Sequence, residues 1–162
     1  MSRADTTVER EVGTTGHVSG SCACGKVRYR VSVLPRRSTI CHCITCQKIA
    51  GGPYIPWIHA PTDKIDWLQQ PVTWNCSDLA ERGYCASCGS AIYMRYHMDP
   101  TITSIAMGTI DESSGRIPSS KEHIFLKDKA SWLKLPDDGT ARHEKFDAPF
   151  QERLNKYEMD QK

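Results

Sequence analysis

The chain has 162 residues, and 21 lysines and arginines against 19 aspartates and glutamates give it a net charge of +2. So small a charge does not by itself indicate nucleic-acid binding, which needs a concentrated basic face, and we expect no nucleic-acid partner. No apolar run approaches the roughly 20 residues of a membrane span, so we expect no membrane partner either.

Residues 1–18 are polar and without periodicity, and we expect them to form a mobile N-terminal tail. Beyond the tail, period-2 alternation and short apolar runs predict a mainly β protein of short strands. Residues 78–83 and 108–120 are largely polar, and we expect loops there. The expected strands are residues 26–33, 54–59, 64–68, 72–74, 91–96, 101–107 and 123–126.

Two helical segments are expected. Residues 45–50 are long enough for a short helix, and Gly51 and Gly52 directly after them favour a stop. A helix that begins near Cys43 would point backbone N–H groups at nearby sulfur atoms, which is a favourable field for a thiolate. The charged C-terminal tail, residues 147–162, has apolar residues on one side and could be helical.

Seven of the eight cysteines lie in three short clusters. The first is the Cys22–Cys24 pair, the second is the C-x-C-x-x-C segment Cys41–Cys46, and the third is the Cys85–Cys88 pair. Gly25 and Gly89 directly follow the two pairs, and glycine permits the sharp turn that brings closely spaced thiols together. Zinc binds thiolates in a tetrahedral arrangement at about 2.3 Å, and cysteines this close in the sequence can supply neighbouring ligands of such a site.

The number of cysteines suggests two kinds of zinc site. The two pairs together supply four thiolates, which is enough for a closed structural site. The C-x-C-x-x-C segment supplies three and leaves one coordination position open, as in catalytic sites. We therefore expect two zinc ions per chain, one structural and one catalytic. The structural ligands would be Cys22, Cys24, Cys85 and Cys88, and the catalytic ligands Cys41, Cys43 and Cys46.

Other uses of the cysteines stay open. Disulfides would suit a short secreted chain, but no signal peptide is apparent, which favours reduced thiols and a cytoplasmic location. All seven clustered cysteines could instead hold purely structural zinc if His42 or His97 supplied an eighth ligand. Cys76 has no close partner in the sequence, and its simplest interpretation is a small buried apolar side chain.

The three clusters, in this order, resemble the glutathione-dependent formaldehyde-activating enzyme family, which also includes centromere protein V. The likeness covers about residues 18–135 and implies a β-tent (Mss4-like) fold of packed antiparallel sheets. It implies a single zinc-binding catalytic domain, which we place at residues 19–146. The motifs that carry it are residues 20–25, 41–52 and 84–90, and His123-Ile124-Phe125 followed by Ala130-Ser131-Trp132.

The resemblance also implies an activity and its residues. The named activity of the family joins formaldehyde to glutathione, which implies a carbon–sulfur lyase type of enzyme with a small-molecule substrate, glutathione being one candidate. The resemblance implies a structural zinc on the two pairs and a more labile, catalytic zinc on the three-cysteine segment. The expected catalytic residues are Cys41, Cys43, Cys46 and, as a candidate proton carrier from the C-terminal motif, His123.

The charge of a three-thiolate zinc site favours one kind of chemistry. Three thiolates give the site a net negative charge, which makes the metal a weaker Lewis acid than a zinc with neutral ligands. Such a site is suited to hold a fourth thiolate, which stays nucleophilic and adds to an aldehyde or a similar electrophile. His42 is a second candidate proton carrier, and Tyr54, Trp57 and Tyr93 could wall a pocket or belong to the core.

Two alternative functions stay open. The same zinc site could act on a different metabolite in a biosynthetic pathway, or the chain could be a non-catalytic zinc module that binds a protein partner. The complete three-cysteine set favours an enzyme, because a structural module needs no open coordination position. The sequence leaves the substrate and the oligomeric state open, and an exposed strand edge would permit a homodimer.

Overall fold

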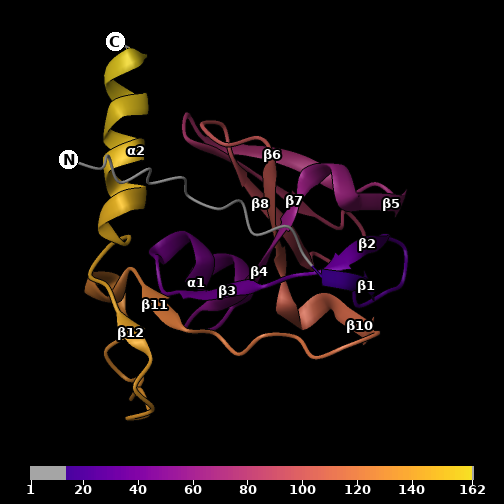
Figure 1. Cartoon of the computed structure of the whole chain (residues 1–162), viewed down its shortest axis with the longest axis horizontal. Coiled ribbons are helices and arrows are strands. Elements are labelled where there is room, and N and C mark those ends of the chain that lie inside the picture. The colour runs from indigo at the N-terminus through magenta and orange to yellow at the C-terminus, as the bar shows by residue number, and fades with distance from the viewer. Residues whose placement is uncertain (1–13, 162) are drawn as a thin grey trace, which may run out of the picture.

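A computed structural model describes residues 14–161, which form a mainly β protein with two sheets (Figure 1). The smaller sheet has four strands, and all of its pairings are antiparallel. In spatial order its strands are β10 (Ile110–Ser113), β1 (Thr14–Ser21), β2 (Arg28–Leu34) and β5 (Ile65–Gln69).

The larger sheet has eight strands and mixes the two pairing directions. In spatial order they are β12 (Ala141–Arg142), β11 (Glu122–Ile124), β3 (Arg37–Cys41), β4 (Ile55–Pro61), β9 (Ile102–Ala106), β8 (Ala91–Tyr96), β7 (Ala80–Tyr84) and β6 (Val72–Ser77). Strand β11 runs parallel to β3 and β12, and the other neighbours are antiparallel. The expected mainly β fold of packed antiparallel sheets is therefore confirmed, with parallel pairs at one end of the larger sheet.

Two α-helices accompany the sheets, α1 (Ile44–Ala50) and α2 (Ala148–Asp160). Helix α1 ends as expected, because Gly51 adopts a left-handed φ of 60° and its amide donates to the Gln47 carbonyl. Helix α2 begins at Asp147, whose carboxylate accepts a hydrogen bond from the Phe150 amide at 2.9 Å. Short 3-10 helices are η1 (Thr62–Lys64), η2 (Met107–Thr109) and η3 (Leu126–Asp128). No helix in the described part of the chain is both long and apolar enough to cross a membrane.

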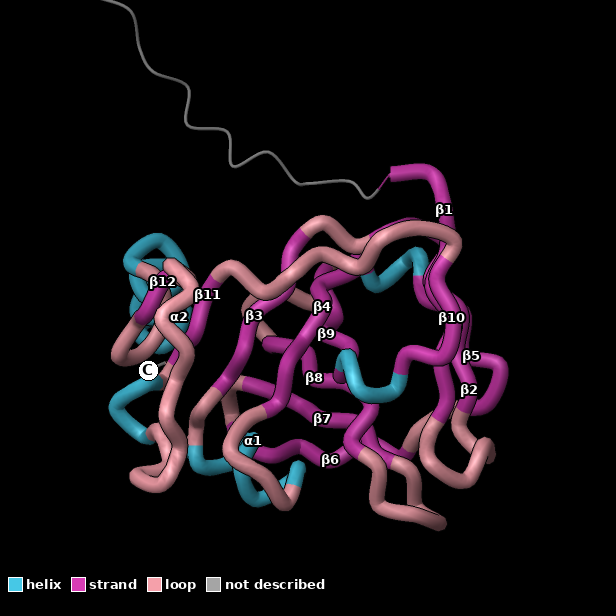
Figure 2. The backbone as a smooth tube through the Cα atoms, turned by 90° about the horizontal axis from the view of Figure 1, so that it is seen from below, coloured by secondary structure: helices cyan, strands magenta, loops and turns pink. Residues whose placement is uncertain are grey.

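The two sheets pack face to face, and their inward side chains form the main hydrophobic core. Figure 2 shows the four strands of the smaller sheet gathered at one side, and beside them the larger sheet, whose strands follow one another from β3 through β4, β9, β8 and β7 to β6. Alternation along the strands selects the core residues, and each of the following is at most 1% exposed. They are Val18, Tyr29 and Val31 from the smaller sheet and Ile58, Ile92 and Ile105 from the larger.

The structure differs from the expectations at the N-terminal end and in two loops. Residues 1–13 of the expected tail lie outside the described residues, whereas residues 14–18 belong to β1. The expected loops at 78–83 and 108–120 are wrong in part, because they contain β7 and β10. Strand β7 holds glycine, glutamate and arginine, which are weak strand formers, but it is paired on both sides by β6 and β8. Pairing in the sheet here outweighs the local preference of the residues.

Gly83 of β7 lies opposite Tyr93 of β8, and the ring occupies the space where a side chain would be. A Cβ added at Gly83 would lie 2.0 Å from Cε1 of Tyr93, whose hydroxyl is anchored 2.9 Å from the Thr73 hydroxyl. We expect Gly83→Ala to lower the free energy of unfolding by about 1–3 kcal/mol, measured by chemical denaturation. The control is Gly108→Ala, where no atom lies within 4 Å of the added methyl group. Equal stability of the two variants would contradict this expectation.

Candidate metal centres

Two turns of similar build carry the two cysteine pairs. In the first, Gly25 has a φ of 73° and its amide donates to the Cys22 carbonyl at 2.9 Å. In the second, Gly89 has a φ of 76° and its amide donates to the Cys85 carbonyl at 2.8 Å. Glycine is the residue that adopts this conformation without steric cost, which explains its place after each pair.

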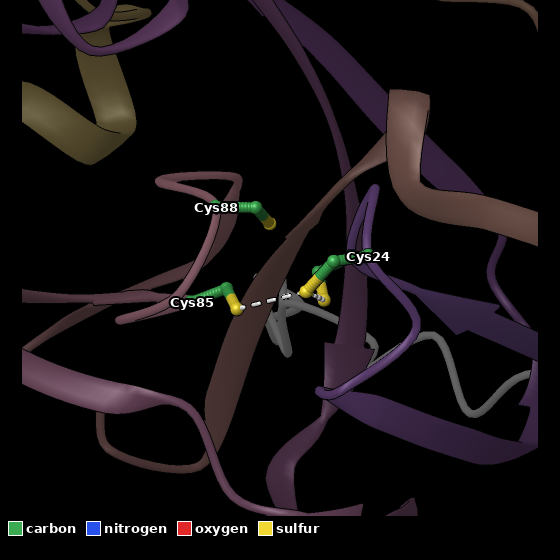
Figure 3. Close-up of side chains that lie close together, drawn as sticks. Cys24, Cys85 and Cys88 are labelled. Carbon is green, nitrogen blue, oxygen red and sulfur yellow. Dashed lines mark hydrogen bonds between the residues drawn. The ribbon is translucent and has the colours of Figure 1, made fainter.

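These turns bring four sulfur atoms together. All four lie within 4.8 Å of one another, and Figure 3 shows Cys24 facing Cys85 and Cys88 from the opposite loop. The Sγ–Sγ distances are 3.5 Å from Cys22 to Cys24 and 3.8 Å from Cys24 to Cys85. These distances exceed the length of a disulfide bond but match the edges of a zinc–thiolate tetrahedron. The donor set therefore fits a closed four-thiolate zinc site.

The second cluster is built by the end of a strand and the start of a helix. Cys41 closes β3, Cys43 caps α1, and Cys46 lies in the first turn of that helix. The Cys46 amide donates to the Cys43 sulfur at 3.4 Å, as the sequence predicts for a helix that begins at the thiolates. The three sulfur atoms lie within 4.8 Å of one another, and no fourth ligand joins them from the described residues.

The three sulfurs share hydrogen bonds that favour one thiolate. Bonds from Cys41 and then Cys46, together with the Cys46 amide, lower the pKa of Cys43 to about 2. The same bonds, with burial, raise the pKa of Cys41. A metal binds cysteine sulfurs as thiolates, so a bound cation would hold all three sulfurs in that form. Three such sulfurs at this distance fit a metal that prefers thiolates, such as zinc.

The guanidinium of Arg82 of β7 lies beside this cluster, a position that the sequence did not predict. Both terminal nitrogens of its guanidinium lie 3.8 Å from the Cys46 sulfur, and its Cζ lies 5.9 Å from the centre of the Trp57 ring. The side chain is buried, and its Nε has no hydrogen-bond partner among the described residues. Burial alone would lower the pKa of Arg82, but the neighbouring sulfurs outweigh it and raise the pKa. A strand at 80–84 would have revealed the residue, but that segment was expected to be a loop.

The two candidate proton carriers contact each other behind the cysteine segment. His42 Nε2 lies 2.8 Å from His123 Nδ1, and the rings are 0% and 4% exposed. Burial lowers the pKa of both, that of His42 to about 4. Neither residue lines the cavity that the three cysteines face, so the role of His123 as a proton carrier stays a prediction. Neither His42 nor His97 belongs to a cysteine cluster, so the proposed eighth zinc ligand has no support among the described residues.

A cavity of about 1410 Å³ lies on the face of the larger sheet opposite the core. Alternate residues of five paired strands form its floor, and the segment from Lys145 to Glu158 forms part of its wall. The floor residues are Arg37, Thr39 and Cys41 of β3; Trp57, His59 and Pro61 of β4; Ile102 and Ser104 of β9; Met94 and Tyr96 of β8; and Ala80 and Arg82 of β7.

The remaining residues singled out in the sequence divide between cavity, core and surface. Trp57 lines the cavity, Tyr93 belongs to the main core, and Tyr54 packs edge-on against His42 at the surface. Cys76 also lines the cavity, where it is half-buried and its thiol donates to the Ala80 carbonyl at 3.1 Å. The expectation that it is a small apolar side chain therefore describes only part of its environment.

His59 on the cavity floor makes the stability of the protein depend on pH. Its ring nitrogens lie 3.1 Å from the Thr39 hydroxyl and 2.9 Å from the Ser104 hydroxyl. Burial, with a smaller effect of Arg37, lowers the pKa of His59 from 6.5 to about 4. The unfolded chain therefore binds this proton first, so stability present above pH 6.5 is lost as the pH falls toward 4.

Between pH 7 and pH 4.5 the free energy of unfolding should fall by about 2 kcal/mol less in His59→Gln than in the wild type. The measurement is denaturant unfolding of wild type and variant at both pH values. Titration of the cysteine clusters affects both proteins alike and cancels in the difference. His97→Gln, at an exposed histidine, is the control that should retain the pH dependence of the wild type. Identical pH dependence in all three proteins would contradict the assignment to His59.

Comparisons with known proteins find a family model, two sequences and a solved structure that are similar to this chain. A family model described as glutathione-dependent formaldehyde-activating enzyme matches residues 17–128. A Halomonas elongata protein, whose name assigns it provisionally to these enzymes, is 29% identical over 127 residues, which is 73% of this chain and 80% of that protein. A Schizosaccharomyces pombe protein named as an uncharacterized lyase is 23% identical over 77 residues, or 48% of this chain and 56% of its own. The crystal structure of a Rhodobacter sphaeroides protein aligns with a TM-score of 0.49 and 14% identity, covering 77% of this chain and 98% of that one.

Proposed function

The chain belongs to the glutathione-dependent formaldehyde-activating enzyme family, and on this premise we propose that it is a zinc-dependent enzyme of the carbon–sulfur lyase type. In the proposed reaction the thiol of a small molecule adds to the carbonyl carbon of an aldehyde or a similar electrophile. The observation that carries the proposal is the cluster of three sulfurs, which opens onto a large cavity without a fourth ligand from the described residues. Glutathione, which the family description names, is the first candidate thiol.

The two clusters would hold metal in different ways. Cys22, Cys24, Cys85 and Cys88 would hold a structural zinc between the two turns, and Cys41, Cys43 and Cys46 would hold a second zinc at the cavity. A zinc with three thiolate ligands keeps an incoming thiol in its nucleophilic thiolate form.

Residues of the chain itself supply the charge and the hydrogen bonds that the addition needs. The guanidinium of Arg82 places a positive charge beside Cys46, which offsets the negative charge of the thiolates in a buried site. Tyr96 lines the same cavity, and burial and then the charge of Cys41 raise its pKa, so its hydroxyl keeps its proton. We assign to this hydroxyl a hydrogen bond to the carbonyl oxygen, which gains negative charge as the carbon–sulfur bond forms and the carbon–oxygen π bond breaks.

His123 has a different role in this proposal from the one that the sequence suggests. It lies behind the cavity, joined to His42, and its strand β11 pairs with β3 at Ile40 and Cys41. The histidine pair therefore links β11 to the cysteine segment from the side away from the substrate. We assign it the role of holding the backbone around Cys41 and Cys43 in place.

The decisive experiment follows the second metal site rather than turnover alone. We expect close to two zinc ions per chain, of which one exchanges for cobalt, and we expect glutathione to change the cobalt absorption spectrum. Consumption of formaldehyde in the presence of glutathione is then measured on the zinc-loaded protein. Cys76→Ser, a change in the same cavity outside both clusters, should leave the spectrum unchanged. A cobalt spectrum that does not respond to thiols would contradict the proposal, and a chain with only one metal site would favour a non-catalytic module.

A further inference from the structure

The C-terminal part of the chain, which lies beyond the matched residues 17–128, covers the cavity of the three cysteines. Two ion pairs hold it over the larger sheet. Asp147, at the start of α2, contacts Arg37 of β3 at 3.1 Å, and Arg153 of α2 contacts Asp99 at 2.7 Å. Figure 1 shows α2 as the yellow helix at one side of the molecule, following β11 and β12. The cover is thus fixed at two points, to strand β3 and to the turn between β8 and β9.

The inner side of this cover is aromatic. Phe146 and Phe150 have ring centres 4.5 Å apart, Phe125 lies 4.7 Å from Phe146, and Tyr96 lies 5.1 Å from Phe150. All four residues line the cavity, and Trp57 lies on its floor. Such rings bind flat, apolar groups well by edge and stacking contacts.

The size of the cavity points in the same direction. Its volume of about 1410 Å³ exceeds the range of about 300–1,000 Å³ that is usual for sites of drug-sized ligands. A cavity of this size would hold the thiol of the proposed reaction together with an aldehyde much larger than one carbon. Two of the arginines that line the cavity, Arg37 and Arg153, are paired with carboxylates, whereas Arg36, Lys127 and Lys145 line it without an ion pair among the described residues. The aromatic wall therefore supplies apolar contact within a cavity that also carries charge.

We propose that the electrophile of this enzyme is a bulky aldehyde with an aromatic body, which lies against Phe146 and Phe150 while its carbonyl carbon reaches the three-cysteine cluster. The inference rests on the proposed function and specifies its substrate class. The step is the same addition: the thiol sulfur bonds to the carbonyl carbon, the carbon–oxygen π bond breaks, and the oxygen takes the proton that the thiol released.

The test separates binding from reaction by using an unreactive analogue. Binding of 2-naphthylmethanol to the zinc-loaded full-length protein is measured by calorimetry, and turnover of 2-naphthaldehyde and of propanal with glutathione is measured alongside. Phe150→Ala removes part of the aromatic wall. Asn155→Trp adds bulk from an exposed cavity-lining position of α2 and leaves the packed rings intact, so it serves if Phe150→Ala unfolds. The control is Met159→Ala on the same helix, exposed and outside the cavity.

We expect both cavity variants to weaken 2-naphthylmethanol binding by about tenfold or more, Phe150→Ala by removing a ring contact and Asn155→Trp by filling part of the cavity. Turnover of 2-naphthaldehyde should fall in parallel, whereas Met159→Ala should change neither binding nor turnover. Turnover of propanal without binding of 2-naphthylmethanol would overturn this inference and uphold the proposed reaction. If both variants weaken the binding of 2-naphthylmethanol but no aldehyde is turned over, the proposed reaction is overturned. The cavity is then upheld as a site for an aromatic ligand.

Discussion

Replacing Cys43 with serine is expected to remove one zinc ion per chain and the thiol–aldehyde activity while the fold stays intact. Cys43 caps helix α1, and its sulfur accepts the amide hydrogen bond of Cys46. Serine is among the best N-cap residues, so the helix keeps its start. The hydroxyl, however, is a poor substitute for a thiolate as a zinc ligand.

The expected loss of activity is large. Removing a partner that only supports a metal ligand typically costs about 10–100-fold, so removing a ligand itself should cost more than about 100-fold. The measurements are zinc content by elemental analysis, kcat/KM with glutathione and formaldehyde or 2-naphthaldehyde, and thermal unfolding. The control is Cys76→Ser, which changes the cavity-lining cysteine that belongs to neither cluster. This variant should keep both zinc ions and the activity. A Cys43→Ser protein with two zinc ions and full activity would show that the cluster is not the active site.

Replacing Cys85 with serine is expected to unfold most of the protein. The Cys85 side chain is 2% exposed and packs in the main core, so this ligand joins the four-cysteine cluster to the packed sheets. A structural zinc contributes about 10–16 kcal/mol of binding free energy, which is as large as the whole stability of about 5–15 kcal/mol of a typical domain. A site with three of its four thiolates should retain too little of this energy to keep the chain folded.

Circular dichroism and metal content test this second expectation. The Cys85→Ser protein should lose strand signal and both zinc ions at 25 °C, because the second cluster depends on the folded sheet. Ala86→Ser places the same hydroxyl on the neighbouring exposed residue and should behave as the wild type. A folded Cys85→Ser protein that keeps one zinc ion would mean that the four-cysteine cluster does not determine the fold.

The features that could be predicted from the sequence depend on neighbours along the chain. The cysteine pairs and the glycines after them define turns by their spacing alone, and the structure has both turns, with a positive φ at Gly25 and at Gly89. Helix α1 likewise follows from a start and a stop signal within a few residues. The alternation around Val31 correctly predicted strand β2 because one face of it is buried.

The features that could not be predicted depend on partners far away in the chain. Strand β7 has weak local preference and exists through its neighbours, so Arg82 could not be placed beside Cys46. His123 could be expected near the cysteine segment, but the side of the strand on which it lies depends on the parallel pairing with β3. The aromatic cover requires α2 to cross over the sheet, and the ion pairs that hold it join residues 54 and 110 positions apart.

The alternation along β4, with Ile58 toward the smaller sheet and Trp57 and His59 toward the cavity, has a consequence for how such proteins diverge. Neighbouring positions of one strand therefore meet different surroundings, because one set packs in the main core and the other set lines the cavity. Mutations that alter substrate preference can therefore accumulate at alternate positions, and in an exchangeable C-terminal segment, without loss of the scaffold. We expect relatives with different substrates to keep Ile58-like residues and to vary at the positions of Trp57, His59 and Phe150.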